Sequence, residues 1–166
     1  MATTPVTLPE PRYPAKIATT ANALVRIAAL ARPLVVTNGV FDLLHLGHVT
    51  YLEQAKALGA SLVVAVNSDA SVRRLGKGDD RPLNTLDDRM AVLAALACVD
   101  LVVPFDDDTP RVLIVACAPD VLVKGGDYTA ATTAGADEVI RGGGRFVAIP
   151  FRHARSTTEL LDRIRR

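Results

Sequence analysis

Leu34-Val35-Val36-Thr37-Asn38-Gly39-Val40 runs directly into Phe41-Asp42-Leu43-Leu44-His45-Leu46-Gly47-His48. The first half is a short apolar run typical of a buried strand, and the second places two histidines three positions apart at a predicted helix start. Gly47 lets the backbone approach a ligand closely, and a helix that begins there directs its free N–H groups to the same place. The stretch therefore predicts a strand, a phosphate site and a helix, at the rim of a parallel sheet.

The same alternation continues along the chain. Apolar strands are predicted at 34–37, 62–66, 100–104, 121–123 and 145–150, and helices at 20–31, 47–58, 85–97, 109–116, 137–141 and 156–165. The run at 62–66 is wholly apolar, as expected of a strand covered on both faces, whereas 67–83 reads as a polar loop. Strands separated by helices form parallel sheets with right-handed crossovers. We therefore predict an α/β fold: a Rossmann-like, doubly wound, five-stranded parallel sheet with helices on both faces.

Length, charge and cysteine usage limit the class of protein. The 166 residues fit one domain, expected over 18–166, and prolines at 5, 8, 11 and 14 predict a poorly ordered lead-in over 1–17. The net charge of +1 provides no field that would attract nucleic acid or an anionic membrane. No apolar run reaches the roughly 18 residues of a membrane span. Cys98 and Cys117 lie in apolar runs and read as reduced core residues, so we expect a cytoplasmic protein.

Polar residues follow four of the five predicted strands. With the glycines and the phenylalanine among them, the candidate site residues are Asn38, Gly39, Phe41 and Asp42 after the first strand, Asn67 and Asp69 after the second, Lys124, Gly125 and Asp127 after the fourth, and Arg152, Arg155, Ser156 and Thr157 after the fifth. Ligands of such sheets bind beyond the carboxyl ends of the strands, where the strand order reverses. The pattern predicts an active site at that edge, centred on His45 and His48.

Other uses of the histidine pair are less consistent with the sequence. One histidine could cap a helix while the other packs in the core, and a metal-ligand role would need the His-Glu-x-x-His spacing that is missing here. No Gly-x-Gly-x-x-Gly follows the first strand, and Gly76-Lys77-Gly78 lacks the spacing of a P-loop. Both common nucleotide motifs are therefore absent, and the histidines remain the centre of the predicted site.

At His45-Leu46-Gly47-His48 the chain resembles the nucleotidyltransferases with a His-x-Gly-His signature. Further segments resemble the members of that family that make ADP-heptose from heptose 1-phosphate and ATP. These segments are Thr37-Asn38-Gly39-Val40-Phe41-Asp42, Ala65-Val66-Asn67-Ser68-Asp69-Ala70-Ser71, Arg81-Pro82-Leu83-Asn84 with Arg89-Met90, Val123-Lys124-Gly125-Gly126-Asp127-Tyr128 and Arg155-Ser156-Thr157-Thr158. Many members carry a sugar-kinase domain on the same chain, whereas this chain resembles the stand-alone form. The resemblance implies a homo-oligomer and a separate kinase that supplies the substrate.

The resemblance implies a specific reaction. A phosphate oxygen of D-glycero-β-D-manno-heptose 1-phosphate would attack the α-phosphorus of ATP in line, releasing pyrophosphate, for lipopolysaccharide inner-core synthesis. Mg²⁺ would accompany ATP without a firm protein ligand. The implied catalytic residues are His45, His48, Lys77 and Lys124; the nucleotide and phosphate residues are Asn38, Gly39, Phe41, Asp42, Gly47, Arg89, Gly125, Asp127, Ser156 and Thr157; and the sugar residues are Asn67 and Asp69.

Several of these roles have an alternative. Lys77 could be a solvated loop lysine, and Asp42 could brace its loop rather than help to hold Mg²⁺. Arg89 could be exposed or form a salt bridge with Asp87 or Asp88 nearby. Residues 125–127 could form an ordinary turn, and Ser156 with Glu159 reads equally as a capping box. The sequence leaves open whether Arg89, Arg152 or Arg155 contacts phosphate.

Two rival functions remain. A cytidylyltransferase acting on glycerol 3-phosphate would carry Arg-Thr-x-Gly-Ile-Ser before its last helix, and Phe151-Arg152-His153-Ala154-Arg155-Ser156 lacks the glycine and isoleucine. A non-catalytic nucleotide-binding scaffold would not need polar groups at four strand ends. The choice of adenine over cytosine rests on the resemblance alone.

Overall fold

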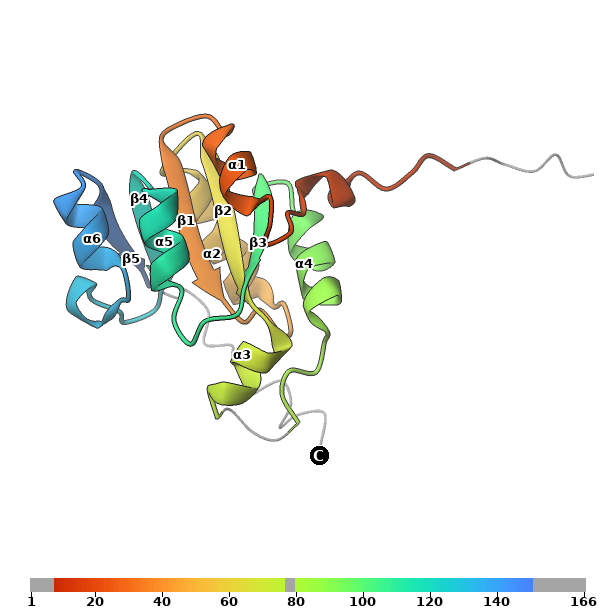
Figure 1. The fold of residues 1–166 in the computed structure, drawn as a ribbon. Coiled ribbons are helices and arrows are strands. Elements are labelled where there is room, and N and C mark those ends of the chain that lie inside the picture. Colours follow the sequence, from red (N-terminus) through yellow and green to blue (C-terminus); the bar gives the residue numbers. More distant parts are fainter. Residues whose placement is uncertain (1–7, 77–79, 151–166) are drawn as a thin grey trace, which may run out of the picture.

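The structure is a computed structural model that describes residues 8–76 and 80–150. Within those residues, five strands form one parallel sheet in the order β3-β2-β1-β4-β5 (Figure 1). The strands are β1 (Leu34–Gly39), β2 (Ser61–Asn67), β3 (Leu101–Phe105), β4 (Val121–Gly125) and β5 (Arg145–Ile149). The order reverses between β1 and β4, so the ligand site is expected beyond the carboxyl ends of these two strands. The predicted fold class is confirmed.

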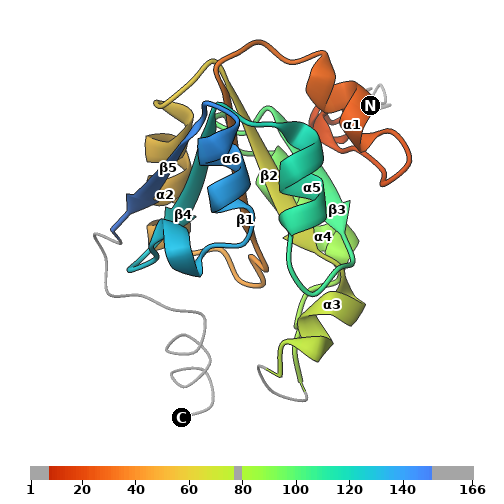
Figure 2. The same cartoon turned by 60° about the vertical axis from the view of Figure 1, so that its left-hand side comes forward.

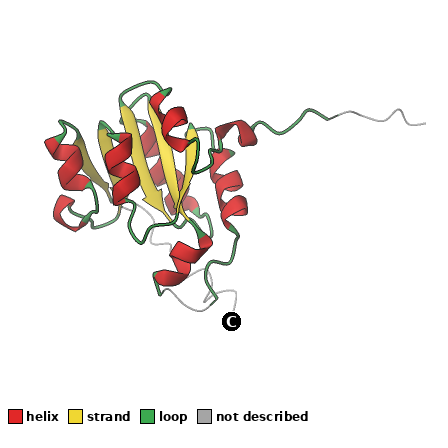
Figure 3. Cartoon of the chain, in the orientation of Figure 1, coloured by secondary structure: helices red, strands yellow, loops and turns green. Residues whose placement is uncertain are grey.

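Helices cover both faces of the sheet, as Figure 3 shows. α2 (Leu46–Lys56) and α4 (Leu86–Ala94) pack on one face, while α1 (Ala23–Ala28), α5 (Arg111–Cys117) and α6 (Ala136–Arg141) pack on the other (Figure 2). α3 (Asp69–Arg74) lies beyond the carboxyl end of β2. Two short 3-10 helices, η1 (Tyr13–Lys16) and η2 (Ala130–Thr132), complete the described elements.

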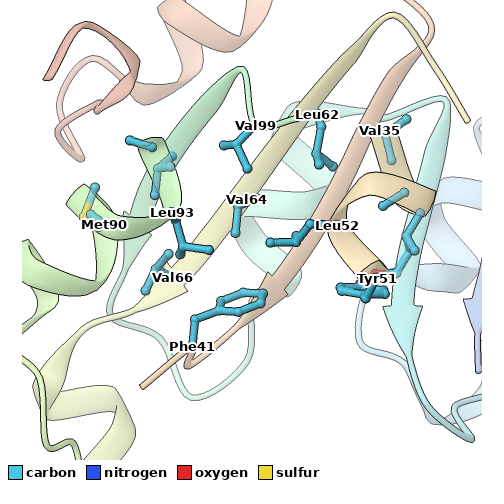
Figure 4. Close-up of a cluster of buried hydrophobic side chains, with 14 of the residues drawn as sticks. Val35, Phe41, Tyr51, Leu52, Leu62, Val64, Val66, Met90, Leu93 and Val99 are labelled. Atoms are coloured by element: carbon cyan, nitrogen blue, oxygen red, sulfur yellow. Dashed lines mark hydrogen bonds between the residues drawn. The ribbon is translucent and has the colours of Figure 1, made fainter. Parts of the chain in front are cut away.

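Alternate residues of each strand enter two hydrophobic cores. Val35 and Val64 pack beneath α2 and α4 (Figure 4), whereas Val36 and Val63 pack beneath the other three helices. Every residue of β2 is buried, which confirms that the apolar run at 62–66 is a central strand with both faces covered. The polar ends of the strands extend from this buried sheet.

Local sequence explains where helices begin. Thr85 caps α4 through its side chain, which accepts a hydrogen bond from the Asp88 backbone N–H, so the helix predicted at 85–97 begins where it was expected. Residues 67–83 do not form the continuous loop that was predicted. Ser68 accepts a hydrogen bond from the Ser71 N–H and caps α3, and Val72 is buried beneath this short helix. Because the segment is mostly polar, its composition did not indicate this short capped helix.

Two further predictions differ from the structure. The lead-in was predicted to be poorly ordered through residue 17, but η1 is held to the domain by Lys16, whose Nζ donates to the Leu96 carbonyl, and Ile17 pairs with Val102. The helix predicted at 20–31 is shorter, Ala23–Ala28, and its Leu24 is 48% exposed because the helix turns Ala23 and Ile27 inward. The helix predicted at 156–165 lies outside the described residues.

Candidate active site

The sheet opens between β1 and β4 where the site was predicted. Their pairing ends at Thr37 and Val123, although β1 continues to Gly39 and β4 continues to Gly125. A cleft of about 470 Å³ begins at this opening. It is lined by Asn38, Gly39, Val40, Phe41, His48, Tyr51, Asn67, Leu75, Asp108, Pro110, Lys124, Gly125 and Tyr128. The cleft therefore collects residues from three strand ends and from α2.

The two histidines stack on each other at the start of α2. Their ring centroids are 3.9 Å apart with an interplanar angle of 22°, and the His48 ring also meets Phe41 edge to face at 5.3 Å. His45 is the N-cap residue, but its side chain makes no capping hydrogen bond. The alternative in which one histidine serves as a side-chain cap is therefore wrong, and His48 faces the cleft.

Burial keeps His48 neutral. Desolvation is the main cause that lowers the pKa of His48 from 6.5 to about 4, and the neighbouring His45 lowers it further. A hydrogen bond with the Leu43 backbone opposes both effects. At neutral pH the uncharged His48 imidazole has a single N–H, which can be donated either to the Leu43 carbonyl or to a phosphate oxygen that takes its place. The first N–H groups of α2, including that of the buried Gly47, add donors at the same helix end.

The backbone before the histidines is tightly constrained. Phe41 adopts a φ of 51°, in the left-handed region that residues with a side chain rarely occupy. A Cβ on Gly39 would lie 2.9 to 3.3 Å from three carbons of the Phe41 ring. Gly39 is therefore required for the Phe41 ring to fold back over the strand end, where it supports His48. Backbone strain of this kind is common at functional sites.

Lys124 spans the opened strands. Its Nζ donates to the Asn38 carbonyl at 3.2 Å and lies 5.3 Å from the centroid of the Tyr128 ring. The Asn38 amide oxygen is buried and has no hydrogen-bond partner among the residues that the structure describes. An ammonium and a buried amide thus meet at the cleft wall, where a ligand rich in oxygen atoms and hydroxyl groups would find partners.

Arg89 occupies a different position from the one predicted. Its guanidinium donates to the carbonyls of Asn84, Val40 and Asn67 and to the Asp69 carboxylate, and its side chain is fully buried. Four of its five N–H groups are thereby engaged. Arg89 does form a salt bridge, but with Asp69 and not with Asp87 or Asp88, the partners expected from the sequence. Arg89 ties α4 to the ends of β1 and β2, and it does not line the cleft. The same contact engages Asp69, which was predicted to contact the sugar.

Asp42 braces the loop before α4. Its buried carboxylate accepts hydrogen bonds from the backbone N–H groups of Leu83 and Asn84, at 2.9 and 3.0 Å, and pairs with the Arg81 guanidinium at 2.5 Å. Both carboxylate oxygens are therefore used by protein donors, and Asp42 does not fit a Mg²⁺ ligand. Over residues 8–76 and 80–150, no group of three metal-ligating side chains comes together.

The other predicted residues fall into three sets. Asn38, Gly39, Phe41, His48, Asn67, Lys124 and Gly125 line the cleft, and His45 and Gly47 lie directly beside it in the first turn of α2 and its cap. Asp127 is exposed and is not among the lining residues. Lys77, Arg152, Arg155, Ser156 and Thr157 lie outside the described residues, so their roles stay predictions. Cys98 and Cys117 are free thiols, and Cys117 is buried.

Several lining residues were missed by the sequence analysis. Tyr51 follows His48 by three positions, so helical spacing alone places both on one face of α2 and would have revealed it. Tyr128 follows the predicted Asp127 directly. Val40 lies between the predicted residues Gly39 and Phe41, whereas Leu75, Asp108 and Pro110 come from segments whose path no local pattern reveals.

This geometry agrees with the comparisons with known proteins. The sequence model of the cytidylyltransferase-like family matches residues 36–160, three quarters of the chain, and includes every described residue of the cleft. The chain therefore belongs to the cytidylyltransferase-like family, a class of nucleotidyltransferases.

Two relatives show which members of this family the chain resembles. The chain is 60% identical to D-beta-D-heptose 1-phosphate adenylyltransferase of Bordetella bronchiseptica over 156 residues, which cover 93% of this chain and 96% of that protein. It is 52% identical to Bifunctional protein HldE of Coxiella burnetii (strain RSA 493 / Nine Mile phase I) over 142 residues. That match covers 86% of this chain but only 30% of the bifunctional protein.

Solved structures agree on the fold. A lipopolysaccharide core biosynthesis protein from Thermoplasma volcanium superposes with a TM-score of 0.60 and 28% identity, covering 74% of this chain and 98% of that one. Pantoate-beta-alanine ligase from Francisella tularensis, at 13% identity and a TM-score of 0.55, covers 86% of this chain and 68% of its own and shares the fold alone. No helix within the described part of the chain is long and apolar enough to cross a membrane.

Proposed function

We propose that the chain transfers AMP from ATP to a heptose 1-phosphate, giving ADP-heptose and pyrophosphate for lipopolysaccharide inner-core synthesis. The observation that carries the proposal is the stacked histidine pair at the start of α2, set at the opening between β1 and β4. The 60% identity to a D-beta-D-heptose 1-phosphate adenylyltransferase over almost the whole chain supports ATP and heptose 1-phosphate as the substrates.

The reaction is an in-line displacement. A phosphate oxygen of the sugar phosphate forms a bond to the α-phosphorus of ATP, the bond from that phosphorus to the bridging oxygen breaks, and pyrophosphate leaves. Positioning and charge stabilisation supply most of the acceleration in such transfers. The site supports these roles because neutral N–H donors and a lysine ammonium group lie along the same wall of the cleft. We assign the phosphate contacts to His48, to the first N–H groups of α2 and to Lys124.

Mg²⁺ enters in this proposal as part of the MgATP substrate. The described carboxylates near the cleft support this view, because Asp42 is engaged by Arg81 and by two backbone N–H groups, while Asp108 pairs with Arg74. The metal would neutralise charge on the phosphates, and the protein would hold the phosphates rather than the metal. A cytoplasmic location, a homo-oligomer and a separate kinase that phosphorylates the sugar complete the proposal.

A substrate panel tests the function. Pyrophosphate release is measured with ATP or CTP, each combined with heptose 1-phosphate or glycerol 3-phosphate, with and without Mg²⁺. We expect release only with MgATP and heptose 1-phosphate together. Release with CTP and glycerol 3-phosphate would instead identify a cytidylyltransferase. ATP binding without product under any combination would indicate a non-catalytic nucleotide-binding protein.

A variant tests the assignment of the histidines. His48→Ala removes the imidazole from the cleft wall, so we expect turnover to fall by about a hundredfold or more while the far-ultraviolet circular dichroism spectrum is unchanged. His48→Asn keeps an amide N–H donor group and is expected to retain more activity than His48→Ala. Near-normal turnover of a folded His48→Ala variant would refute the assignment.

A further inference from the structure

The opening between β1 and β4 has a side chain at its apex. Thr37 and Val123 are the last paired residues of the two strands, and the Tyr51 hydroxyl contacts both of them. It is hydrogen-bonded to the Thr37 hydroxyl and donates to the Val123 carbonyl at 3.3 Å. One phenol on α2 therefore joins both strands at the residues where they begin to separate.

The direction of these hydrogen bonds is fixed by their chemistry. The tyrosine is buried, and desolvation raises the pKa of Tyr51 well above its ordinary value, so the phenol keeps its single proton. That proton goes to the Val123 carbonyl, which can only accept. The Thr37 hydroxyl must then donate to the Tyr51 oxygen. The chain of hydrogen bonds runs from β1 through α2 to β4 in one direction.

On their outer sides, β1 and β4 stay hydrogen-bonded to the neighbouring strands. β1 remains paired with β2 as far as Gly39, and β4 remains paired with β5 as far as Gly125. Beyond Tyr51 the inner edges of β1 and β4 are instead spanned by Lys124, which reaches the Asn38 carbonyl. The split is thus local, and Tyr51 stands at its closed end while the cleft occupies its open end.

Tyr51 is also linked to the histidines through α2. It follows His48 by three residues, so the two side chains are neighbours on one helix face. Figure 4 shows Tyr51 on α2 beside the sheet, with Phe41 at the end of β1. Because the hydroxyl anchors this face of α2 to both strands, it sets where the first turn of the helix stands over the cleft.

We infer that Tyr51 is a positioning residue whose hydroxyl, held between Thr37 and Val123, fixes the width of the β1–β4 opening and the placement of His48 above it. The inference rests on the proposed function, since it assigns the hydroxyl a part in nucleotidyl transfer. The hydroxyl acts through the strands and the helix, because its proton and the lone pair facing Thr37 are already engaged by protein groups.

The first test is kinetic. Tyr51→Phe keeps the ring in the core and removes only the hydroxyl. We expect kcat to fall about 10- to 100-fold, because small misplacements of reacting groups cost that much, while the KM for ATP changes less than threefold. Tyr13→Phe, which removes a phenol from η1 far from the cleft, is the matched control and keeps the wild-type rate. A kcat of folded Tyr51→Phe within twofold of wild type would overturn the inference.

A double-mutant cycle tests the pathway through Thr37. Thr37→Val removes the donor to Tyr51 with little change in volume, and we expect it to lower kcat as Tyr51→Phe does. The double variant should be no slower than the slower single variant, because both changes break one unit. Thr37→Ser keeps a hydroxyl and should lose less than Thr37→Val. Independent losses that multiply in the double variant would overturn the inference.

A spectroscopic readout separates this inference from the proposed function. The chain has three histidines, so the imidazole signals of His48 can be assigned by nuclear magnetic resonance without any substrate. We expect them to move in Tyr51→Phe and in Thr37→Val, and to stay in place in Tyr13→Phe. Unchanged signals in both Tyr51→Phe and Thr37→Val would refute the positioning role. Absence of ADP-heptose formation by the wild type would refute the proposed function alone.

Discussion

A single residue, His48, shows how burial suits a side chain to its chemistry. A charged imidazole would attract phosphate more strongly, but burial first, and then the stacked His45, make a charge costly at this position. The neutral form needs no counter-ion before ATP arrives, and a phosphate oxygen can accept its one N–H in place of the Leu43 carbonyl. Electrostatic stabilisation by donors that are already oriented is usually the largest contribution to catalysis.

The lowered pKa of His48 predicts a pH dependence of stability. Its pKa is about 4 in the folded chain and 6.5 in the unfolded chain, so between these values the unfolded state binds the extra proton. The free energy of unfolding should therefore decrease as the pH falls from about 6.5 to about 4, by about 3 kcal/mol from this residue. Urea denaturation of wild type and His48→Gln at several pH values measures this contribution. Parallel pH profiles of the two proteins would contradict it.

Arg89 gives a second prediction at the scale of one residue. Arg89→Met would leave three carbonyls and the Asp69 carboxylate without their donor, so we expect the free energy of unfolding to fall by about 3 kcal/mol or more. Asp69→Asn removes only the charge of one partner, which is partly exposed, and should cost less. Chemical denaturation measures both. A large rise in the KM for ATP without any loss of stability would instead restore the phosphate role that the sequence suggested.

At the scale of elements, local patterns predicted what depends on local contacts. β2 was found because its apolar run is buried on both faces, and the start of α4 was found because Thr85 and Asp88 form a local cap. α3 was missed because it has only six residues, and its single fully buried apolar side chain, Val72, gives no periodicity. The interactions of Arg89 could not be predicted, since its partners lie 5 to 49 positions away.

The turn between β1 and α2 yields a prediction for Gly39. A methyl group at this position would clash with the Phe41 ring, which cannot move without disturbing its edge-to-face contact with His48. We expect Gly39→Ala to lose about 1 to 3 kcal/mol of stability, as overpacked cores do, and to lower kcat as well. Steady-state kinetics and thermal denaturation measure the two effects. If the ring is the cause, Gly39→Ala/Phe41→Leu will be no worse than Phe41→Leu alone.

At the scale of the whole molecule, the sequence located the site better than it identified the role of each residue. Topology explains this difference. The carboxyl ends of parallel strands lie at one edge of the sheet, so the polar residues at these ends, Asn38, Asn67 and Lys124, had to lie close together there. Topology does not determine which of these groups face the cleft and which face the protein. Asp42 and Arg89 turn inward because the loops around them supply unpaired backbone groups.

A last prediction concerns the response of the entire fold to its substrate. The cleft is built from β1, β2, β4 and α2, which belong to the central sheet and its cover, so a ligand bound there stabilises the cooperative unit. ATP with Mg²⁺ at a hundred times its dissociation constant should add about 2.7 kcal/mol to the free energy of unfolding. For a domain of this size the melting temperature should rise by about 5 to 10 °C. Differential scanning calorimetry with ATP, and with CTP at the same concentration, measures the shift, and His48→Ala should reduce the shift with ATP. An equal rise with CTP would mean that the cleft does not discriminate between the bases, and the preference for adenine would then have to come from a later step than binding.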